Sequence, residues 1–206
     1  MKKLKLLLLL GVMVSATAMA DVIEVRAGGD LTHNGKFKDG KYSGSNVKLK
    51  KKSTRNGYEI AGEYRKSLTD AWEIGGGVAY KFNRISEEGT EKKGLHQVPL
   101  YLTARYNFKN ASEVTPYVKA NLGYAFNSGR LKDSKPLYDF EAKFKNGFYS
   151  GLGTGLQYKN FVVDLSYNWN NVRVERTYKY PLVTEHDKFT ISHGTLTLGA
   201  GYSFGF

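Results

Sequence analysis

Apolar and polar residues alternate along much of the chain, and the alternation is most regular in residues 191–206. From Leu196 to Phe206, leucine, alanine and aromatic residues occupy the even positions, and small or polar residues occupy nearly all the odd ones. Alternate residues of a β-strand point to opposite faces of its sheet. The pattern therefore predicts a strand with one continuous apolar face that ends in aromatic side chains.

The same alternation recurs in seven segments upstream, so the sequence predicts an all-β fold of eight strands. The predicted strands cover residues 22–31, 58–65, 71–84, 97–108, 116–127, 144–158, 161–169 and 191–206. Polar segments predict long loops at 32–57, 85–96, 128–142 and about 170–189, and short turns at 66–70, 109–115 and 159–160. This alternation of long and short connections is typical of outer-membrane barrels, which have short periplasmic turns and longer external loops.

Two positions break the simple pattern. Pro99 falls within the fourth predicted strand, and a closed barrel has no edge strand to tolerate proline, so we expect it at the rim or at a bulge. The parity of the apolar residues changes at Asn170 and Asn171, which predicts a bulge there. Val172 and Val174 would then continue a strand that projects beyond the membrane.

Aromatic residues of the apolar face gather at both ends of the predicted strands. Those near the turns are Trp72, Tyr106, Phe108, Tyr158, Phe161, Phe204 and Phe206. Those near the loops are Tyr58, Tyr80, Phe82, Tyr124, Phe126, Tyr167 and Trp169. The strand from Trp72 to Phe82 is about 33 Å long and, once tilted, rises about 25 Å. This rise matches the apolar band between the two girdles of a transmembrane barrel, whereas a soluble β-sandwich requires no such belts.

Residues 1–20 have the three parts of a secretory signal peptide: Lys2, Lys3 and Lys5, then an apolar segment, then a small-residue cleavage site at 18–20. The predicted organisation is a signal peptide at 1–20 and one barrel domain at 21–206. Residues 21–206 contain no apolar run long enough for a transmembrane helix, so a membrane location requires a closed barrel. The absence of cysteine excludes disulfides and cysteine-based metal sites.

The chain ends with an aromatic residue at 206, a second at 204 and a glycine at 201. This spacing resembles the C-terminal signal strand of outer-membrane β-barrels. The whole of 21–206 resembles the small eight-stranded outer-membrane barrels, such as the transmembrane domain of OmpA and its OmpX-like relatives. The resemblance implies an eight-stranded antiparallel up-and-down transmembrane β-barrel, with Gly201, Phe204 and Phe206 as the signal for the barrel-assembly machinery. We expect a monomer in the bacterial outer membrane, with both termini periplasmic and four loops external.

Eight strands enclose an interior that side chains just fill. The residues of the inward parity include six acids and five bases. They are Glu24, Asp30, Glu59, Glu63, Glu73 and Asp164, and Arg26, Arg65, Lys81, Arg105 and Lys119. Charges in a narrow interior have to pair, because an unpaired buried charge costs several kcal/mol. The sequence therefore predicts an ion-pair network that plugs the barrel.

The chain is basic, with a formal charge of +12 that becomes +9 without the three signal lysines. This charge favours an anionic partner, either lipopolysaccharide or an acidic glycan, and a secreted strand protein makes nucleic acid the least expected one. The candidate anion-binding residues lie in the first long loop: Lys36, Lys38, Lys41, Lys48, Lys50, Lys51, Lys52 and Arg55. Two interpretations stay open, a surface that binds lipopolysaccharide or host glycans and a solvated loop that only neutralises the outer leaflet.

Some eight-stranded barrels are enzymes that act on lipid A, but no catalytic group is evident in this sequence. Ser192 and His193 are adjacent in a predicted strand and so point to opposite faces. His96, His186 and His193 lack the spacing of a metal site. We therefore expect no catalytic residue, metal or cofactor. A structural or surface-interaction role in the outer membrane is favoured, ahead of a narrow channel for small solutes, and a lipid A-modifying enzyme comes third.

Overall fold

The computed structural model describes residues 21–37, 46–47, 57–85, 93–135, 138–179 and 184–206. The eight strands of the barrel are β1 (Asp21–Phe37), β3 (Gly57–Ser67), β4 (Trp72–Ile85), β5 (Lys93–Asn107), β6 (Val114–Ser128), β9 (Gly147–Tyr158), β10 (Phe161–Lys179) and β11 (Thr184–Gly205). Three further strands in the described residues are β2 (Asn46–Val47), β7 (Arg130–Lys135) and β8 (Tyr138–Lys145). The predicted signal peptide, residues 1–20, lies outside the described residues.

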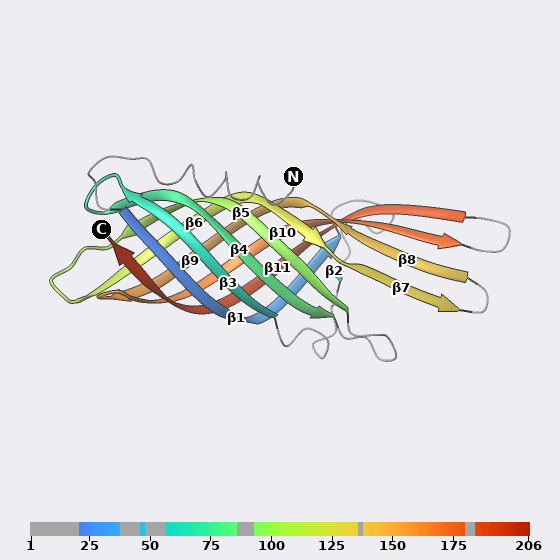
Figure 1. The fold of residues 1–206 in the computed structure, drawn as a ribbon, viewed down its shortest axis with the longest axis horizontal. Helices are drawn as coiled ribbons and strands as arrows, with labels where there is room; N and C mark the ends of the chain where they lie inside the picture. The colour runs from blue at the N-terminus through green and yellow to red at the C-terminus, as the bar shows by residue number, and fades with distance from the viewer. Residues whose placement is uncertain (1–20, 38–45, 48–56, 86–92, 136–137, 180–183) are drawn as a thin grey trace.

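Hydrogen bonding runs round a complete ring of strands (Figure 1). From β1 the order is β3, β4, β5, β6, β9, β10 and β11, and β11 pairs back with β1. Every one of these pairings is antiparallel. Where the ring closes, the N–H of Asp21 donates to the carbonyl oxygen of Phe206 at 3.0 Å, and the N–H of Phe206 donates back at 3.1 Å. The predicted eight-stranded, up-and-down antiparallel barrel is therefore confirmed.

The barrel carries its apolar residues outside and its charged residues inside. Leu102 is 72% exposed and Leu152 is 58% exposed, although each lies in the middle of a strand. Arg65 and Arg105 are each only 1% exposed. This arrangement suits a lipid bilayer. The hydrocarbon covers the outer apolar face, and the closed ring leaves no strand edge with unpaired backbone groups. Among the described residues, there is no helix with the length and apolarity needed to cross a bilayer.

Aromatic pairs mark both ends of the outward face. At the end with the short turns, Trp72 packs edge-on against Tyr106, with ring centroids 5.0 Å apart. At the opposite end, Tyr167 packs edge-on against Trp169 at 4.5 Å. The two belts therefore lie where the spacing of aromatic residues in the sequence predicts them.

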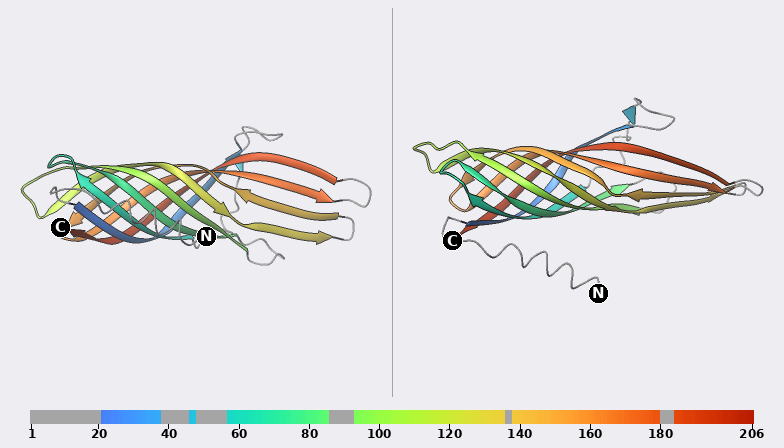
Figure 2. Two further views of the ribbon diagram at one scale, coloured as in Figure 1. Left: turned by 45° about the horizontal axis from the view of Figure 1, so that its top comes forward. Right: turned by 90° about the horizontal axis from the view of Figure 1, so that it is seen from above.

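A hairpin and two strand extensions continue the barrel wall beyond one rim. β10 and β11 remain paired as far as Lys179 and Thr184, β8 pairs with the outer part of β10, and β7 pairs with β8. We call this four-stranded sheet, residues 130–135, 138–145, 172–179 and 184–190, the extension; it projects along the long axis of the barrel (Figures 1 and 2). The loops predicted at 128–142 and 170–189 are therefore wrong for most of these residues.

The extension has its apolar side chains inside, which is the reverse of the barrel. Its buried cluster consists of Ala142, Val172, Val174 and Phe189, with Phe144 and Ile191 packed against it. Val172 and Val174 are each 3% exposed and have the same inward parity as the buried Asn168 and Asn170 before them. Beyond the aromatic belt the outer face meets water, so burial of apolar side chains is favourable only on the inner face.

The irregularity predicted at Asn170 and Asn171 lies in the neighbouring strand instead. β10 keeps a single register with β11 along its whole length. On the other side of β10, Asn170 pairs with Tyr149 of β9 and Arg173 pairs with Lys145 of β8. An advance of three residues along β10 therefore corresponds to an advance of four residues from Tyr149 to Lys145, so this side contains one extra residue. The extra residue forms a bulge at the junction of β8 and β9 and reverses the parity of β8.

Pro99 lies in the middle of β5, with its side chain buried, and the prediction of a rim or bulge position is wrong. It pairs with Ala125 of β6. The β4–β5 ladder is interrupted beside it, between the pairs Val78–Leu100 and Lys81–Gln97, and the register is the same on both sides of the gap. Because proline has no N–H to donate, the barrel gives up ladder bonds at this point without a change of register.

Candidate functional site

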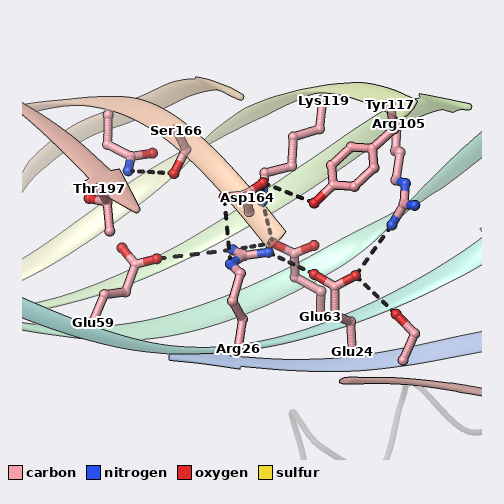
Figure 3. A network of polar contacts seen from close by, with 12 residues as sticks. Glu24, Arg26, Glu59, Glu63, Arg105, Tyr117, Lys119, Asp164, Ser166 and Thr197 are labelled. Atoms are coloured by element: carbon pink, nitrogen blue, oxygen red, sulfur yellow. Dashed lines mark hydrogen bonds and ion pairs between the residues drawn. The ribbon is translucent and has the colours of Figure 1, made fainter. Parts of the chain in front are cut away.

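All eleven predicted lumen residues point into the barrel, and they come from six strands: β1, β3, β4, β5, β6 and β10. Figure 3 shows the central part of this group. Alternate residues of a barrel strand face the same side, so a single parity delivers all of them to one narrow interior. All except Glu73 are buried, and the Glu73 side chain is 13% exposed.

Arg65 is bound by three carboxylates at once. Its Nη2 lies 2.8 Å from Glu24 Oε2, its Nη1 lies 2.7 Å from Glu63 Oε2, and its Nε lies 2.8 Å from Glu73 Oε2. The guanidinium group has five N–H donors in a planar fork, which suits several carboxylates better than a lysine would. Arg65 therefore ties β1, β3 and β4 together at the turn end of the lumen.

Arg26 forms a second junction, one layer further from the turns. Its Nη1 lies 2.8 Å from Glu24 Oε1 and its Nη2 lies 3.0 Å from Glu63 Oε1. Its Nε lies 3.8 Å from Asp164 Oδ1 on β10, two strands away round the ring. Glu24 and Glu63 thus both bridge Arg26 and Arg65, and the contact between Arg26 and Asp164 links β1 to β10.

The far wall contributes Lys119 and an aromatic ring. Lys119 Nζ lies 2.9 Å from Asp164 Oδ2 and 3.9 Å from Glu63 Oε1. The hydroxyl of Tyr117 donates to Asp164 Oδ2 at 3.2 Å. The Arg105 guanidinium lies over the Tyr117 ring, 3.7 Å from its centroid, and its Nη1 reaches Glu24 Oε2 at 3.3 Å.

Lys81 holds the layer nearest the extension. Its Nζ lies 3.1 Å from Glu59 Oε2 and 3.6 Å from Asp30 Oδ1, and it donates to the hydroxyls of Thr195 at 3.0 Å and Thr197 at 3.2 Å. Glu59 also lies 4.0 Å from Arg26. This last contact joins the Lys81 group to the rest, so the eleven residues form one continuous network.

Glycines on β9 and β11 leave room for these long side chains. A Cβ at Gly199 would lie 3.3 Å from the side chain of Arg26, and one at Gly153 would lie 3.0 Å from that of Lys119. A Cβ at Gly155 would overlap the ring of Tyr117. The network therefore uses small residues on one side of the lumen to seat large ones from the other.

Neutral polar residues, which the charge pattern did not single out, line the lumen between the network and the extension. They are Asn83, Gln97, Asn121, Asn127, Asn168 and Asn170, all buried, and we call them the amide layer. Within the described part of the chain, both polar atoms of the Asn83 side chain and Nε2 of Gln97 have no hydrogen-bond partner. Buried polar groups of this kind are normally satisfied by water. Their inward parity was the signal in the sequence that could have found them.

A hollow opens at the turn end of the lumen. It has a volume of about 230 Å³ and is lined by Glu73, Asn107, Lys109, Glu113, Thr115, Gln157 and Lys159. Asn107 Nδ2 donates to Glu73 Oε1 at 2.7 Å, and Arg105 Nη2 donates to Gln157 Oε1, so the network forms its floor. We call this hollow the vestibule.

Those of the other predicted site residues that the structure describes lie outside this network. Lys36 is exposed on β1, and the remaining first-loop residues, Lys38, Lys41, Lys48, Lys50, Lys51, Lys52 and Arg55, lie outside the described residues. The aromatic side chains of the C-terminal motif, Phe204 and Phe206, face outward, while Gly201 lies against β1. The three histidines considered for a metal lie apart: His96 is bonded to Tyr80 on the outer wall, His186 is on the extension, and His193 is in the lumen.

Comparison with known proteins agrees with the barrel fold. The family model of the outer membrane protein beta-barrel domain matches residues 5–204. The uncharacterized protein PM1543 of Pasteurella multocida (strain Pm70) is 27% identical over 123 residues, which cover 53% of this chain and 50% of that protein. The chain therefore spans about half the length of that curated relative.

Two solved structures are similar in fold. The outer membrane protein OprG from Pseudomonas aeruginosa is 12% identical with a TM-score of 0.54, and the match covers 92% of this chain and 98% of OprG. A major outer membrane protein from Thermus thermophilus is 14% identical with a TM-score of 0.52, and the match covers 89% of this chain and 99% of that protein. At these identities the likeness extends to the fold alone.

Proposed function

The chain belongs to the outer membrane protein beta-barrel domain family, and on this premise we propose that it is a closed, non-enzymatic barrel with a structural and surface-interaction role. Membership of the family places it in the bacterial outer membrane. The proposal assigns the lumen a stabilising task and assigns contact with other molecules to the loops and the extension.

The observation that carries this proposal is the ion-pair network across the lumen. Glu24 contacts three arginines, Glu63 contacts two arginines and Lys119, and Arg65 is only 1% exposed, which supports a lumen filled by paired charges. Opening a path would strand buried carboxylates, which costs several kcal/mol for each uncompensated charge. A rigid plug of this kind favours a structural anchor over a channel that conducts ions.

The arrangement of the connections supports an orientation with the extension outside the cell. The described turns at 68–71, 108–113 and 159–160 lie at one end together with Asp21 and Phe206, and the extension lies at the other (Figure 1). Short turns are periplasmic and longer connections external in outer-membrane barrels. In this orientation Gly201, Phe204 and Phe206 lie on the strand that the assembly machinery would recognise from the periplasm, and the barrel functions as a monomer.

The first-loop lysines and Arg55 are proposed as a binding surface for lipopolysaccharide or acidic glycans. The support is their sequence: eight cations with Asp39 as the only acid between 32 and 57. Replacement of Lys48 and residues 50–52 by glutamine should reduce retention on immobilised heparin or lipopolysaccharide, while the same change at Lys109 and Lys159 on the turns should not. Equal retention by all variants would mean that the loop is only a solvated surface.

The closed lumen is tested by single-channel recording on the refolded protein in planar bilayers. The wild-type protein and the turn variant Lys109→Ala should show no discrete conductance, whereas the double substitution Arg65→Ala with Arg105→Ala should conduct because it removes two of the three arginines that fill the lumen. Lipid A incubated with the wild-type protein should keep its mass. Discrete wild-type current contradicts the closed barrel, and a change in the acyl chains contradicts the non-enzymatic role.

A narrow channel is the second candidate, and two features favour it. The amide layer and the vestibule hold polar groups on opposite sides of the charged layer. A rearrangement of the charged side chains between them would therefore connect two polar spaces. The same recordings decide between the candidates, since a channel would conduct without any substitution.

A further inference from the structure

A cluster of basic side chains lies on the outer face of the extension, immediately beyond the aromatic belt. On β10, Arg173 lies directly opposite Lys145 of β8, and Glu175 lies between Lys143 of β8 and Lys188 of β11. These residues have the outward parity, because the alternate residues of the same strands form the buried apolar cluster. We call Lys143, Lys145, Arg173 and Lys188 the extension cation patch.

The carboxylates of this face do not balance its cations. Glu175 is shared, with its Oε2 3.7 Å from Lys145 Nζ and its Oε1 4.0 Å from Lys188 Nζ. Lys143 Nζ lies 3.7 Å from Glu141 Oε1. Within the described residues no ion pair involves Arg173, which is exposed. Four cations therefore share two carboxylates, and the excess positive charge centres on Arg173.

The position of Arg173 opposite Lys145 itself indicates an anion. Like charges that face each other across two strands destabilise the pair, whereas opposite charges stabilise it. A bound phosphate between the two side chains would turn the repulsion into two charge-assisted bonds, and the guanidinium fork can engage two phosphate oxygens at once. The exposed fractions of Lys145, 51%, and Lys188, 71%, leave both ammonium groups accessible to a ligand.

The end of the patch nearest the barrel, Arg173 and Lys145, lies close to the height of the phosphate layer of a membrane. Trp169 belongs to the outer aromatic belt, and Arg173 is two outward positions further along β10. Four residues of strand are about 13 Å long and rise about 10 Å when tilted by roughly 40°. The headgroup layer extends about 5–8 Å beyond the hydrocarbon. Long side chains from this level reach down to phosphates whose acyl chains lie against the aromatic belt.

We propose that the extension cation patch binds the phosphate groups of a phosphorylated glycolipid in the outer leaflet. This inference rests on the proposed orientation and deepens the proposed surface-interaction role. A lipid-borne phosphate is favoured over a soluble sulfated glycan because the patch adjoins the lipid-facing wall. Trp169 and Phe148 are both exposed, and they lie four residues before Arg173 and three residues after Lys145, on the barrel side of the patch. The apolar wall and the patch together fit a molecule that has both acyl chains and phosphates.

The test compares two lipids and two matched double variants of the full-length barrel, with bound lipid counted by native mass spectrometry. The lipids are bisphosphorylated lipid A and its dephosphorylated form. Arg173→Gln with Lys145→Gln removes two charges from the patch, and Lys109→Gln with Lys159→Gln removes two from the turns. The patch variant should bind bisphosphorylated lipid A about tenfold to thirtyfold more weakly than the wild type, and the turn variant should match the wild type. All three proteins should bind the dephosphorylated lipid equally.

Equal binding of bisphosphorylated lipid A by the patch variant and the wild type would overturn the inference. So would a patch variant that loses binding of soluble sucrose octasulfate but keeps lipid A binding, because this result assigns the patch to a sulfated glycan. Should the double variant fail to fold, as judged by heat-dependent migration on a gel, the single change Arg173→Gln gives the same comparison with a smaller, severalfold effect. Wild-type conductance would contradict the closed barrel but would leave this ratio unaffected, so the two failures are distinguishable.

Discussion

Replacement of Arg65 by methionine should destabilise the barrel strongly. Methionine keeps much of the side-chain length but removes the charge, and the three hydrogen-bonded contacts of Arg65 at 2.7–2.8 Å are lost together. The change leaves six lumen acids with four bases in place of five. Because the site is buried, the freed carboxylates have no bulk water to replace the guanidinium.

The magnitude follows from how completely each carboxylate is stranded. Glu24 keeps its contacts with Arg26 and Arg105, Glu63 keeps its contacts with Arg26 and Lys119, and Glu73 accepts a hydrogen bond from Asn107. Loss of one partner of a buried ion pair costs about 3–5 kcal/mol. Since each acid retains another partner, we expect the free energy of unfolding to fall by the lower end of this range, about 3 kcal/mol. This loss corresponds to about a hundredfold decrease in the folding equilibrium constant.

The assay is urea unfolding of the protein refolded in lipid vesicles, followed by tryptophan fluorescence, with the free energy extrapolated to zero urea. Lys109→Met on an exposed turn is the matched control and should change the free energy of unfolding by less than about 0.5 kcal/mol. The double variant Arg65→Met with Glu63→Gln should cost less than the sum of its two single changes, because the two residues are in direct contact.

A cost below about 1 kcal/mol for Arg65→Met would refute this reasoning. It would mean that water reaches Glu24 and Glu63 and solvates them, so that the lumen is wet. The closed-barrel proposal would then lose its main support.

Three further outcomes are expected. A methyl group at Gly155 would overlap a tyrosine ring and a backbone carbonyl, so Gly155→Ala should cost about 1–3 kcal/mol in urea unfolding, whereas Gly62→Ala, with no atom within 4 Å, should be near neutral. Phe189→Ala should speed amide exchange in the extension about a hundredfold and leave the barrel strands unchanged; faster exchange throughout would contradict a separate cluster. Single-tryptophan proteins that retain Trp72 or Trp169 should be quenched equally by brominated lipids, each about 12 Å from the bilayer centre, and a solvent-exposed spectrum for either would contradict the belts.

The barrel could be predicted from the sequence because its inside and outside are chemically distinct. A period of two assigns each residue to one face, and one rule, apolar outward, holds in the barrel strands, as at Trp72 in the third predicted strand and Phe206 in the last. The sequence predicts that Val172 and Val174 continue a strand beyond the membrane, but the four-stranded extension and its inward apolar face could not be predicted in this way. Val172, Val174 and Phe189 alternate as regularly as the barrel residues, but they face inward. The alternation gives the two faces of a strand and does not tell which face meets lipid and which meets water.

The charged members of the site could be selected by parity, but their partners could not. Glu24 is reached by Arg105 from a strand 81 residues away, and this contact depends on the stagger between strands and on side-chain length. The neutral Asn83 and Gln97 were missed because they carry no charge to balance. The position of Pro99 within the sheet could not be predicted either, because the register on both sides of it depends on the neighbouring strands β4 and β6.

The bond between the first and last barrel strands has a consequence for biogenesis. β1 pairs with β11, so the first barrel strand to be synthesised can complete its pairing only after the last barrel strand has been synthesised. Until both are present, any partial sheet exposes two rows of unpaired N–H and C=O groups, which promote aggregation in water and are costly in lipid. A carrier therefore has to keep the polypeptide unfolded during its transit, and sealing of the wall is the final, all-or-none step of insertion.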